Sequence, residues 1–219
     1  MAEIWKMLVQ KLALSLDKLN AYPKDPGLRQ KVEDLVHEAH LLLWAVGERK
    51  PRQLSLSTCA MAASNAPRDW QAILVFMQLT QGQAQQLLAC RRTMLHEVGA
   101  LIAEWDRLWK ELESFKGVEE KGHGLVTHHL QTAAITEQLR VNVHSLYTCT
   151  AFYQSYACTK VLSPVQFARY LVVSYPWGPD TLSLMTCLAQ HCGERSTGEL
   201  LRMARPRAAA GAGAAPEPQ

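Results

Sequence analysis

The sequence predicts an all-α protein, an antiparallel multi-helix bundle built on two long helices. Between residues 80 and 115, apolar residues return at alternating steps of four and three, which is the heptad pattern of a long amphipathic helix. After a glycine-containing break at 116–124, a second apolar series at helical spacing runs from Ile135 to Ala157. Because two long helices joined by a turn must hide their apolar stripes from water, we expect them to lie antiparallel.

The apolar stripe of the first long helix is interpreted as bundle core, not as a leucine zipper. Its members are Ala84, Leu88, Leu95, Val98, Ile102, Trp105, Trp109 and Leu112. A further apolar column runs beside it: Leu87, Met94, Leu101 and Leu108. The apolar face is therefore broader than a two-stranded seam, and Arg91 falls within it. The segment 64–80 upstream holds a single basic residue, Arg68, so the basic helix of a zipper protein is missing.

Two amphipathic helices are predicted at the start of the chain. They cover residues 4–20 and 28–46 and are separated by the turn-forming segment 22–27. Gly47 is predicted to be the C-terminal cap of the second helix. The polar, small-residue stretch 48–69 is predicted to be a loop, and its length makes it either functional or disordered.

Two capping signals place the later helices. After a short helix over 70–79, Thr80 and Gln83 form a capping box that begins the first long helix. The sequence Ser163-Pro-Val-Gln166 combines a capping box with proline at the first helical position, so a helix begins at Pro164. This helix must end by Tyr175, because Pro176 disfavours helical geometry in the residue before it. A last helix is predicted to end near Gly193.

Composition sets the domain organisation and the broad class. Residues 1–193 are predicted to form one helical bundle domain, and residues 194–219 a tail that is first basic and then low in complexity, built of Ala, Gly and Pro. The net charge of +3 is too mild to indicate a nucleic-acid partner. No apolar run reaches membrane-spanning length, and no signal peptide is recognisable, so we expect a soluble chain that is not secreted. The six cysteines are then expected to be reduced thiols.

The histidines are interpreted as surface residues. His37 and His40 lie three apart, a spacing that can serve a metal, but no second cluster of ligands occurs at matching positions. His191 and Cys192 are adjacent only in sequence, which is not the geometry of a base and its nucleophile. Three further histidines lie beside the glycine-containing turn: His123, His128 and His129. We therefore expect no metal and no cofactor.

Signatures of known enzyme classes are also missing from the sequence. It contains no phosphate loop, nucleophile elbow, zinc-protease helix or dinucleotide fingerprint. The carboxylates of the first long helix alternate with Arg107 and Lys110, as on a solvated face: Glu104, Asp106, Glu111 and Glu113. We expect that the chain is not an enzyme and has no catalytic residues.

Three segments carry a resemblance to a known family. They are the run Leu87–Leu101, the helix start Leu162–Leu171 and the segment Tyr175-Pro-Trp-Gly-Pro-Asp180. Together they resemble the region carboxy-terminal to the basic zipper in green-algal bZIP transcription factors, and more distantly the helical domain of plant TGA-class bZIP and seed-dormancy proteins. The resemblance is strongest over residues 80–190. It implies an all-helical regulatory module in the nucleus, or otherwise in the cytoplasm. The basic region and zipper of the family are absent from this chain, so no specific DNA binding by the chain alone is carried over.

Two functions from different classes follow. The first is a protein-interaction module of a bZIP-related transcription regulator, with protein partners that include transcriptional proteins. The alternative is a helical sensor that holds haem or a lipid between its helices. A Soret band in the absorption spectrum of the purified protein would reveal bound haem. For the first function, the partner surface is placed at Tyr175, Pro176, Trp177 and Asp180, because two prolines and a glycine present these aromatics in a rigid turn. The other interpretation of Trp177 is that it folds back to plug the end of the bundle.

Overall fold

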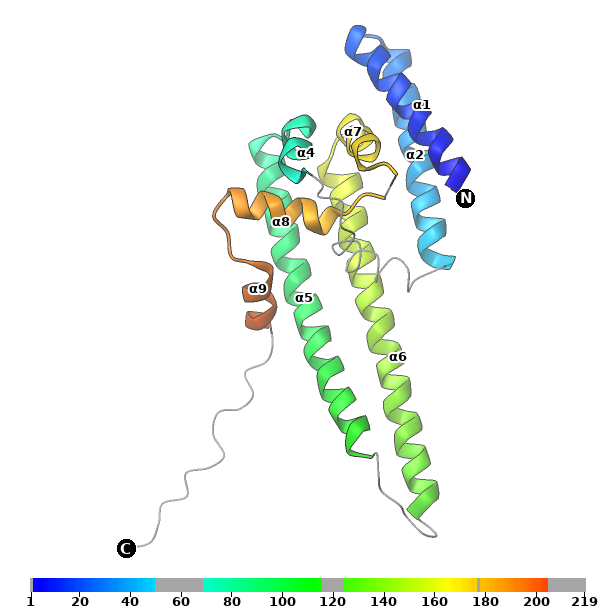
Figure 1. Cartoon of the computed structure of the whole chain (residues 1–219), viewed down its shortest axis with the longest axis vertical. Helices are drawn as coiled ribbons and strands as arrows, with labels where there is room; N and C mark the ends of the chain where they lie inside the picture. Colours follow the sequence, from blue (N-terminus) through cyan, green and yellow to red (C-terminus); the bar gives the residue numbers. More distant parts are fainter. Residues whose placement is uncertain (1, 50–68, 116–123, 177, 205–219) are drawn as a thin grey trace, which may run out of the picture. The chain divides into compact units, whose positions relative to one another are not determined.

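The computed structural model describes residues 2–49, 69–115, 124–176 and 178–204. In these ranges it contains eight α-helices, one π-helical turn and no strand, so the predicted all-α class is confirmed (Figure 1). The elements are α1 (Ala2–Ala21), α2 (Pro26–Arg49), α4 (Trp70–Met77), α5 (Gln81–Ser114), α6 (Gly124–Tyr156), η2 (Ala157–Val161), α7 (Pro164–Ser174), α8 (Thr181–His191) and α9 (Thr197–Ala204).

The chain divides into two compact units. The first consists of Met1–Met94 and Tyr147–Ser196, and the second of Leu95–Leu146 and Thr197–Gln219. The long helices α5 and α6 contribute one part to each unit. The domain boundaries expected from composition, 1–193 and 194–219, stay a prediction, although α9 is a helix that composition did not indicate.

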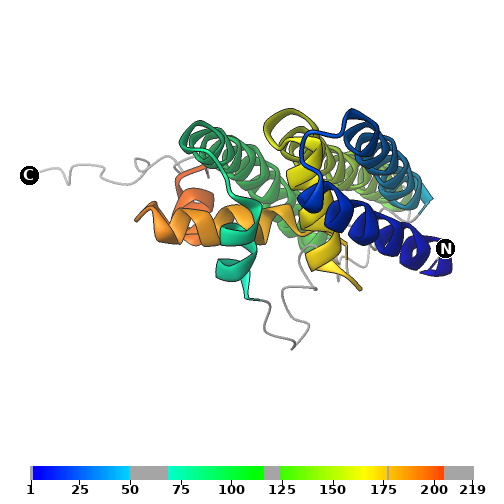
Figure 2. The ribbon, with the colours of Figure 1, turned by 90° about the horizontal axis from the view of Figure 1, so that it is seen from above.

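In the first unit, α1 and α2 lie side by side and both pack against α7 (Figures 1 and 2). Their inward positions are fully buried, as the apolar periodicity predicts: Leu12, Leu16, Val32 and Ala39 are among them. Helix α2 begins two residues earlier than predicted because Asp25 caps it. Its Oδ1 accepts hydrogen bonds from the backbone N–H groups of Gly27 and Leu28 at 2.8 and 3.2 Å.

The other end of α2 corrects the sequence analysis. Gly47 does not cap this helix, because α2 continues to Arg49. A glycine inside a helix costs about 1 kcal/mol relative to alanine, which weakens a helix without ending it. Of the predicted loop 48–69, residues 50–68 lie outside the described part of the chain.

Both predicted capping boxes are confirmed. Thr80 Oγ1 accepts from the Gln83 N–H at 3.2 Å and Gln83 Oε1 from the Thr80 N–H at 3.0 Å, while Ser163 and Gln166 make the same reciprocal pair at 3.3 and 2.9 Å. The two glutamines also contact each other, with Gln83 Nε2 at 2.7 Å from Gln166 Oε1. Gln166 Nε2 donates to the backbone carbonyl of Gln78 at 3.2 Å. The starts of α5 and α7 are thereby joined to the end of α4.

The two long helices pair in opposite directions in each unit. In the second unit, Asn142 Nδ2 donates to the Leu101 carbonyl at 3.1 Å and a ring nitrogen of His128 lies 3.2 Å from the Phe115 carbonyl. In the first unit, Gln83 Nε2 donates to the Val161 carbonyl and the Cys90 thiol to the Tyr153 carbonyl. In both units a later residue of α5 faces an earlier residue of the α6 segment, which is consistent with the expected antiparallel arrangement.

Arg91, the cation in the apolar stripe of α5, is the largest fully buried side chain among the described residues. Arg91 Nη1 donates to the Arg195 carbonyl at 3.1 Å, and Arg91 Nε lies 3.4 Å from Thr186 Oγ1. Its neighbour Arg92 forms an ion pair with Glu194. Both arginines thereby connect α5 to α8 and to the segment that follows it. Burial lowers the pKa of Arg91, and the charge of Glu194 opposes this shift.

In the second unit, α9 packs closely against α5 at Gly99. A Cβ placed on Gly99 would lie 2.6 Å from Ala204 Cβ and 3.1 Å from the Leu201 carbonyl oxygen, so only glycine permits this approach. Further along the stripe the expectation fails. Trp105 and Trp109 are each 38% exposed, whereas Leu108 of the adjacent column is buried.

Candidate interaction surface

The predicted partner surface begins where α7 ends, and its described residues differ in their exposure to solvent. Tyr175 is 41% exposed and Pro176 is exposed, joined by a cis peptide bond. Trp177 lies outside the described residues, so neither interpretation of its side chain is tested. Asp180 is buried.

Asp180 is the N-cap of α8. Its Oδ1 accepts from the Ser183 backbone N–H at 3.1 Å, and its Oδ2 accepts from the Ser183 hydroxyl at 2.6 Å. A carboxylate occupied in this way below the surface does not meet a partner. The sequence carried a signal for this role, since Asp180 is followed three residues later by Ser183 at the start of an apolar helical pattern.

Exposed apolar side chains lie near this corner on α4 and α7, which pack against each other. Val75 is 75% exposed, Phe76 is 47% exposed and Val173 is 40% exposed. Val173 lies four residues after Arg169 and therefore one turn further along the same face of α7.

Arg169 holds this surface together. Its guanidinium carbon lies 5.7 Å from the centroid of the Phe76 ring, an arrangement typical of a cation–π contact. Nη1 donates to Gln78 Oε1 at 3.2 Å and Nη2 lies 3.5 Å from Asn20 Oδ1. Within the described ranges, the ion pairs found do not include Arg169. We call Val75, Phe76, Arg169 and Val173 the α4–α7 patch.

The sequence of helix α4 contains a sign of this patch. Helix α4 reads Trp-Gln-Ala-Ile-Leu-Val-Phe-Met and is apolar on nearly all sides. A short helix of this composition has more apolar faces than one neighbour can cover. Ile73 and Met77 are buried, while Val75 and Phe76 remain at the surface. Only the placement of α7 and α8 decides which of its faces stays open.

The histidines and cysteines of the described ranges do not gather into a site. Among the residues that the structure describes, no group of three His, Cys, Asp or Glu side chains is placed to hold a metal ion. Burial, followed by the charge of His37, lowers the pKa of His40. His191 and Cys192 are both exposed at the end of α8, and His123 lies outside the described part. The described cysteines form no disulfide with one another.

Two of the cysteines are buried thiols. Burial raises the pKa of Cys90 to about 11 and that of Cys158 to about 12. Cys158 Sγ lies 3.6 Å from Thr181 Oγ1, a hydrogen bond that opposes the shift. Neither thiol is activated as a nucleophile by this environment.

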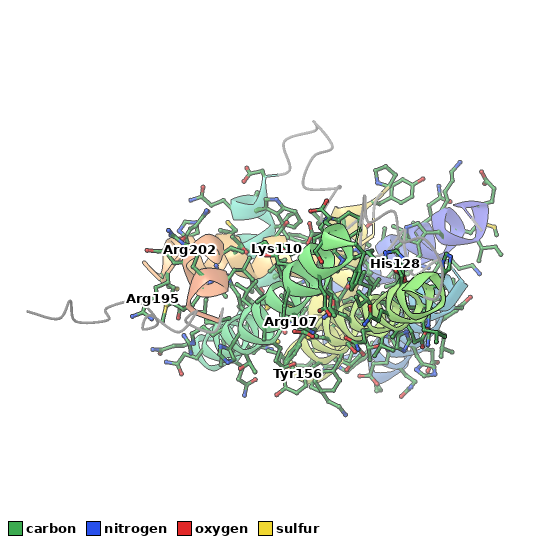
Figure 3. The ribbon with its side chains drawn as sticks, turned by 90° about the horizontal axis from the view of Figure 1, so that it is seen from below. Arg107, Lys110, His128, Tyr156, Arg195 and Arg202 are labelled. Carbon is green, nitrogen blue, oxygen red and sulfur yellow. The ribbon has the colours of Figure 1, made fainter. Side chains whose placement is uncertain are left out.

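The carboxylates of α5 form surface ion pairs. Arg107 binds both carboxylate oxygens of Glu104, at 2.7 and 2.9 Å, and one of Glu111 at 2.9 Å (Arg107 is labelled in Figure 3). The hydrogen bond from Arg107 lowers the pKa of Glu104. The alternating charges predict such i,i+3 and i,i+4 pairs on a solvated helix face.

Two findings on the whole chain complete the description. No helix within the described residues is long and apolar enough to span a membrane. Comparison of the chain with family models, with curated proteins and with solved structures finds no match.

Proposed function

We propose that this chain is a helical protein-interaction module of a bZIP-related transcription regulator, and that a protein partner binds at the α4–α7 patch. The observation that carries the proposal is the composition of that patch. Large apolar side chains from two helices are exposed around an arginine that contacts amide oxygens and an aromatic face. Aromatic residues and arginine are the types enriched among interface hot spots.

The patch is also suited energetically to binding. Complete burial of a Val or Phe side chain contributes roughly 1.5 to 3 kcal/mol, so covering the open parts of Val75, Phe76 and Val173 contributes several kcal/mol in total. Arg169 is already held by Phe76 and Gln78, so less side-chain freedom is lost when a partner contacts it. A partner carboxylate placed there gains a charge-assisted hydrogen bond.

The transcriptional part of the proposal rests on the resemblance of residues 80–190 to bZIP-associated helical regions. The chain has no basic helix before its heptads, so its role in such a system is to bind another protein. Tyr175 and Pro176, at the end of α7, extend the surface available to that partner.

Affinity capture with the full chain tests the proposal. Nuclear extract treated with a DNA-digesting enzyme is passed over the wild type, over the variant V75S/F76A and over the control L130S, which alters a side chain of α6 that is 67% exposed. We expect one set of proteins on the wild type and on L130S, reduced at least tenfold on V75S/F76A. Equal capture by all three forms contradicts the proposal.

A further inference from the structure

A stacked pair of tryptophans lies on the part of α5 that belongs to the second unit. The ring centroids of Trp105 and Trp109 are 5.4 Å apart and their planes differ by 10°. Both are 38% exposed, although they continue an apolar stripe in which Leu88 and Leu95 are buried. Stacked indole rings offer an extended π face to a cation.

Two acidic side chains lie on the side of α5 that α9 contacts. Gly99, Asp106 and Glu113 are spaced by seven residues and therefore lie on one side of the helix. Helix α9 packs at the first of these positions. Trp109 is three residues after Asp106 and four before Glu113, so it is a surface neighbour of both carboxylates.

Helix α9 ends against the same helix, α5, that carries this surface. Ala204, the last residue of α9, is buried against Gly99. Helix α9 and the adjoining part of α5 run in the same direction (Figure 1). Trp105 is six residues beyond Gly99, which is about 9 Å along the helix axis. Three extended residues span about 10 Å, so Arg205 to Arg207 have the length to reach it.

The charges on the two segments are complementary. Residues 95–114 carry five carboxylates and two cations, and the cation Arg107 is already paired with Glu104 and Glu111. The segment that follows α9 reads Arg205-Pro206-Arg207. Pro206 disfavours helical geometry in Arg205, so the sequence after α9 favours an extended path.

We infer that Arg205-Pro206-Arg207 of this chain docks on the Trp105–Trp109 face. One guanidinium lies over the indole rings and the other lies at Asp106 and Glu113. The contact is weak at each point because the groups are near the surface, so it responds to salt and exchanges between docked and released forms. All the residues involved belong to the second unit, so this inference is independent of the α4–α7 patch.

The indole N–H signals of the full chain test the inference. The chain has six tryptophans, and the ¹H–¹⁵N cross-peaks of two of them are assigned with the variants W105F and W109F. Wild type is compared with R205A/R207A and with the control K6A/K11A, which removes two exposed cations from α1. We expect R205A/R207A to shift the Trp105 and Trp109 cross-peaks and leave the other four in place, and K6A/K11A to shift neither.

Two further measurements sharpen the test. In 1 M salt the wild-type cross-peaks should move toward the positions seen in R205A/R207A. The variant R205K/R207K should shift them only part of the way, because lysine keeps the charge but lacks the planar group that stacks on indole. Unchanged cross-peaks in R205A/R207A overturn the inference. So do shifts that depend on protein concentration, which would assign the face to a second copy of the chain.

Discussion

At the scale of single residues, the sequence showed that Arg91 is unusual in its position but did not show which groups it binds. Its position in the apolar stripe of α5 argued against a leucine zipper, but periodicity did not say what the cation does. The structure buries it completely and gives it the Arg195 carbonyl and the Thr186 hydroxyl. A buried cation is tolerated when such groups satisfy it, and removing it leaves them without their donor.

The substitution Arg91→Ala should therefore be costly. We expect a loss of about 2 to 5 kcal/mol in the free energy of unfolding, from the cavity and from the unsatisfied carbonyl. Arg92→Ala is the matched control, since its ion pair with Glu194 is near the surface and contributes at most about 1 kcal/mol. Urea unfolding of the three forms measures both values. Equal, small losses would show that Arg91 is not part of the core.

The buried thiols make stability depend on alkaline pH. Their pKa values are about 11 and about 12 in the folded state, above the ordinary value near 9, so unfolding releases their protons once the pH exceeds 9. The stabilisation is fully present below pH 9 and is lost as the pH rises through about 11 for Cys90 and about 12 for Cys158. Each group then lowers the free energy of unfolding by up to about 1.4 kcal/mol per pH unit.

The variant Cys158→Ala isolates this effect from other groups that titrate at alkaline pH. Urea midpoints of wild type and variant, measured at pH 8 and pH 10, should show a smaller decrease with pH in the variant. A parallel decrease in both proteins would mean that Cys158 is not a buried thiol in solution.

At the scale of the elements, helix starts and ends could be predicted from residues close in sequence. The burial of side chains by segments distant in sequence could not. The starts of α5 and α7 follow from capping boxes whose residues are three apart in sequence. Pro176, which follows the segment, also predicted the end of α7. In contrast, Gly47 is inside α2, because a glycine ends a helix only where the chain also turns. The exposure of Trp105 depends on where α9 ends. The apolar periodicity of α5 does not predict the position of α9.

The capping box of α7 should have a measurable energetic effect. Ser163→Ala removes the acceptor for the Gln166 N–H, and the expected cost is about 1 kcal/mol. Thr136→Ala is the control, because the Thr136 hydroxyl donates to a carbonyl within the middle of α6 and contributes little. Equilibrium unfolding distinguishes them. A cost for Ser163→Ala no larger than that of the control would contradict the role of the cap.

The core of the second unit makes a further prediction about α5. Leu108 is 1% exposed, whereas Ile102, at the centre of the predicted stripe, is only half-buried. Leu108→Ala should cost about 2 to 5 kcal/mol, and Ile102→Ala clearly less. The order of the two urea midpoints is the measurement. A larger loss of stability for Ile102→Ala than for Leu108→Ala would show that the stripe predicted by the heptad pattern forms the core.

At the scale of the whole molecule, the sequence indicated the all-α class, but not which apolar side chains of α4 and α7 stay exposed. Tyr175 and Pro176 were recognisable because turn residues present them. Phe76 and Val75 were not, since they precede Arg169 by more than 90 residues and meet it only through packing of α4 on α7. Asp180 was assigned to a partner although its spacing to Ser183 marks a helix cap.

The isolated chain should show no specific DNA binding. Affinity for DNA depends strongly on clustered cations that neutralise phosphates, and the segment before the heptads has none. We expect no sequence-selective mobility shift at nanomolar protein and physiological salt. Weak binding that disappears when residues 195–219 are removed would be assigned to the arginines of that segment. Nanomolar, selective binding would contradict the proposal of a module that acts through proteins.

Site-specific photo-crosslinking tests the central claim most directly. A photoreactive phenylalanine analogue replaces Val75 in the α4–α7 patch or, as a control, the exposed Leu130 of α6, in the full chain. In nuclear extract treated with a DNA-digesting enzyme, position 75 should give a discrete protein adduct that is absent at position 130 and is competed by excess wild type but not by V75S/F76A. The absence of an adduct at position 75, or an equal adduct at both positions, would contradict the account.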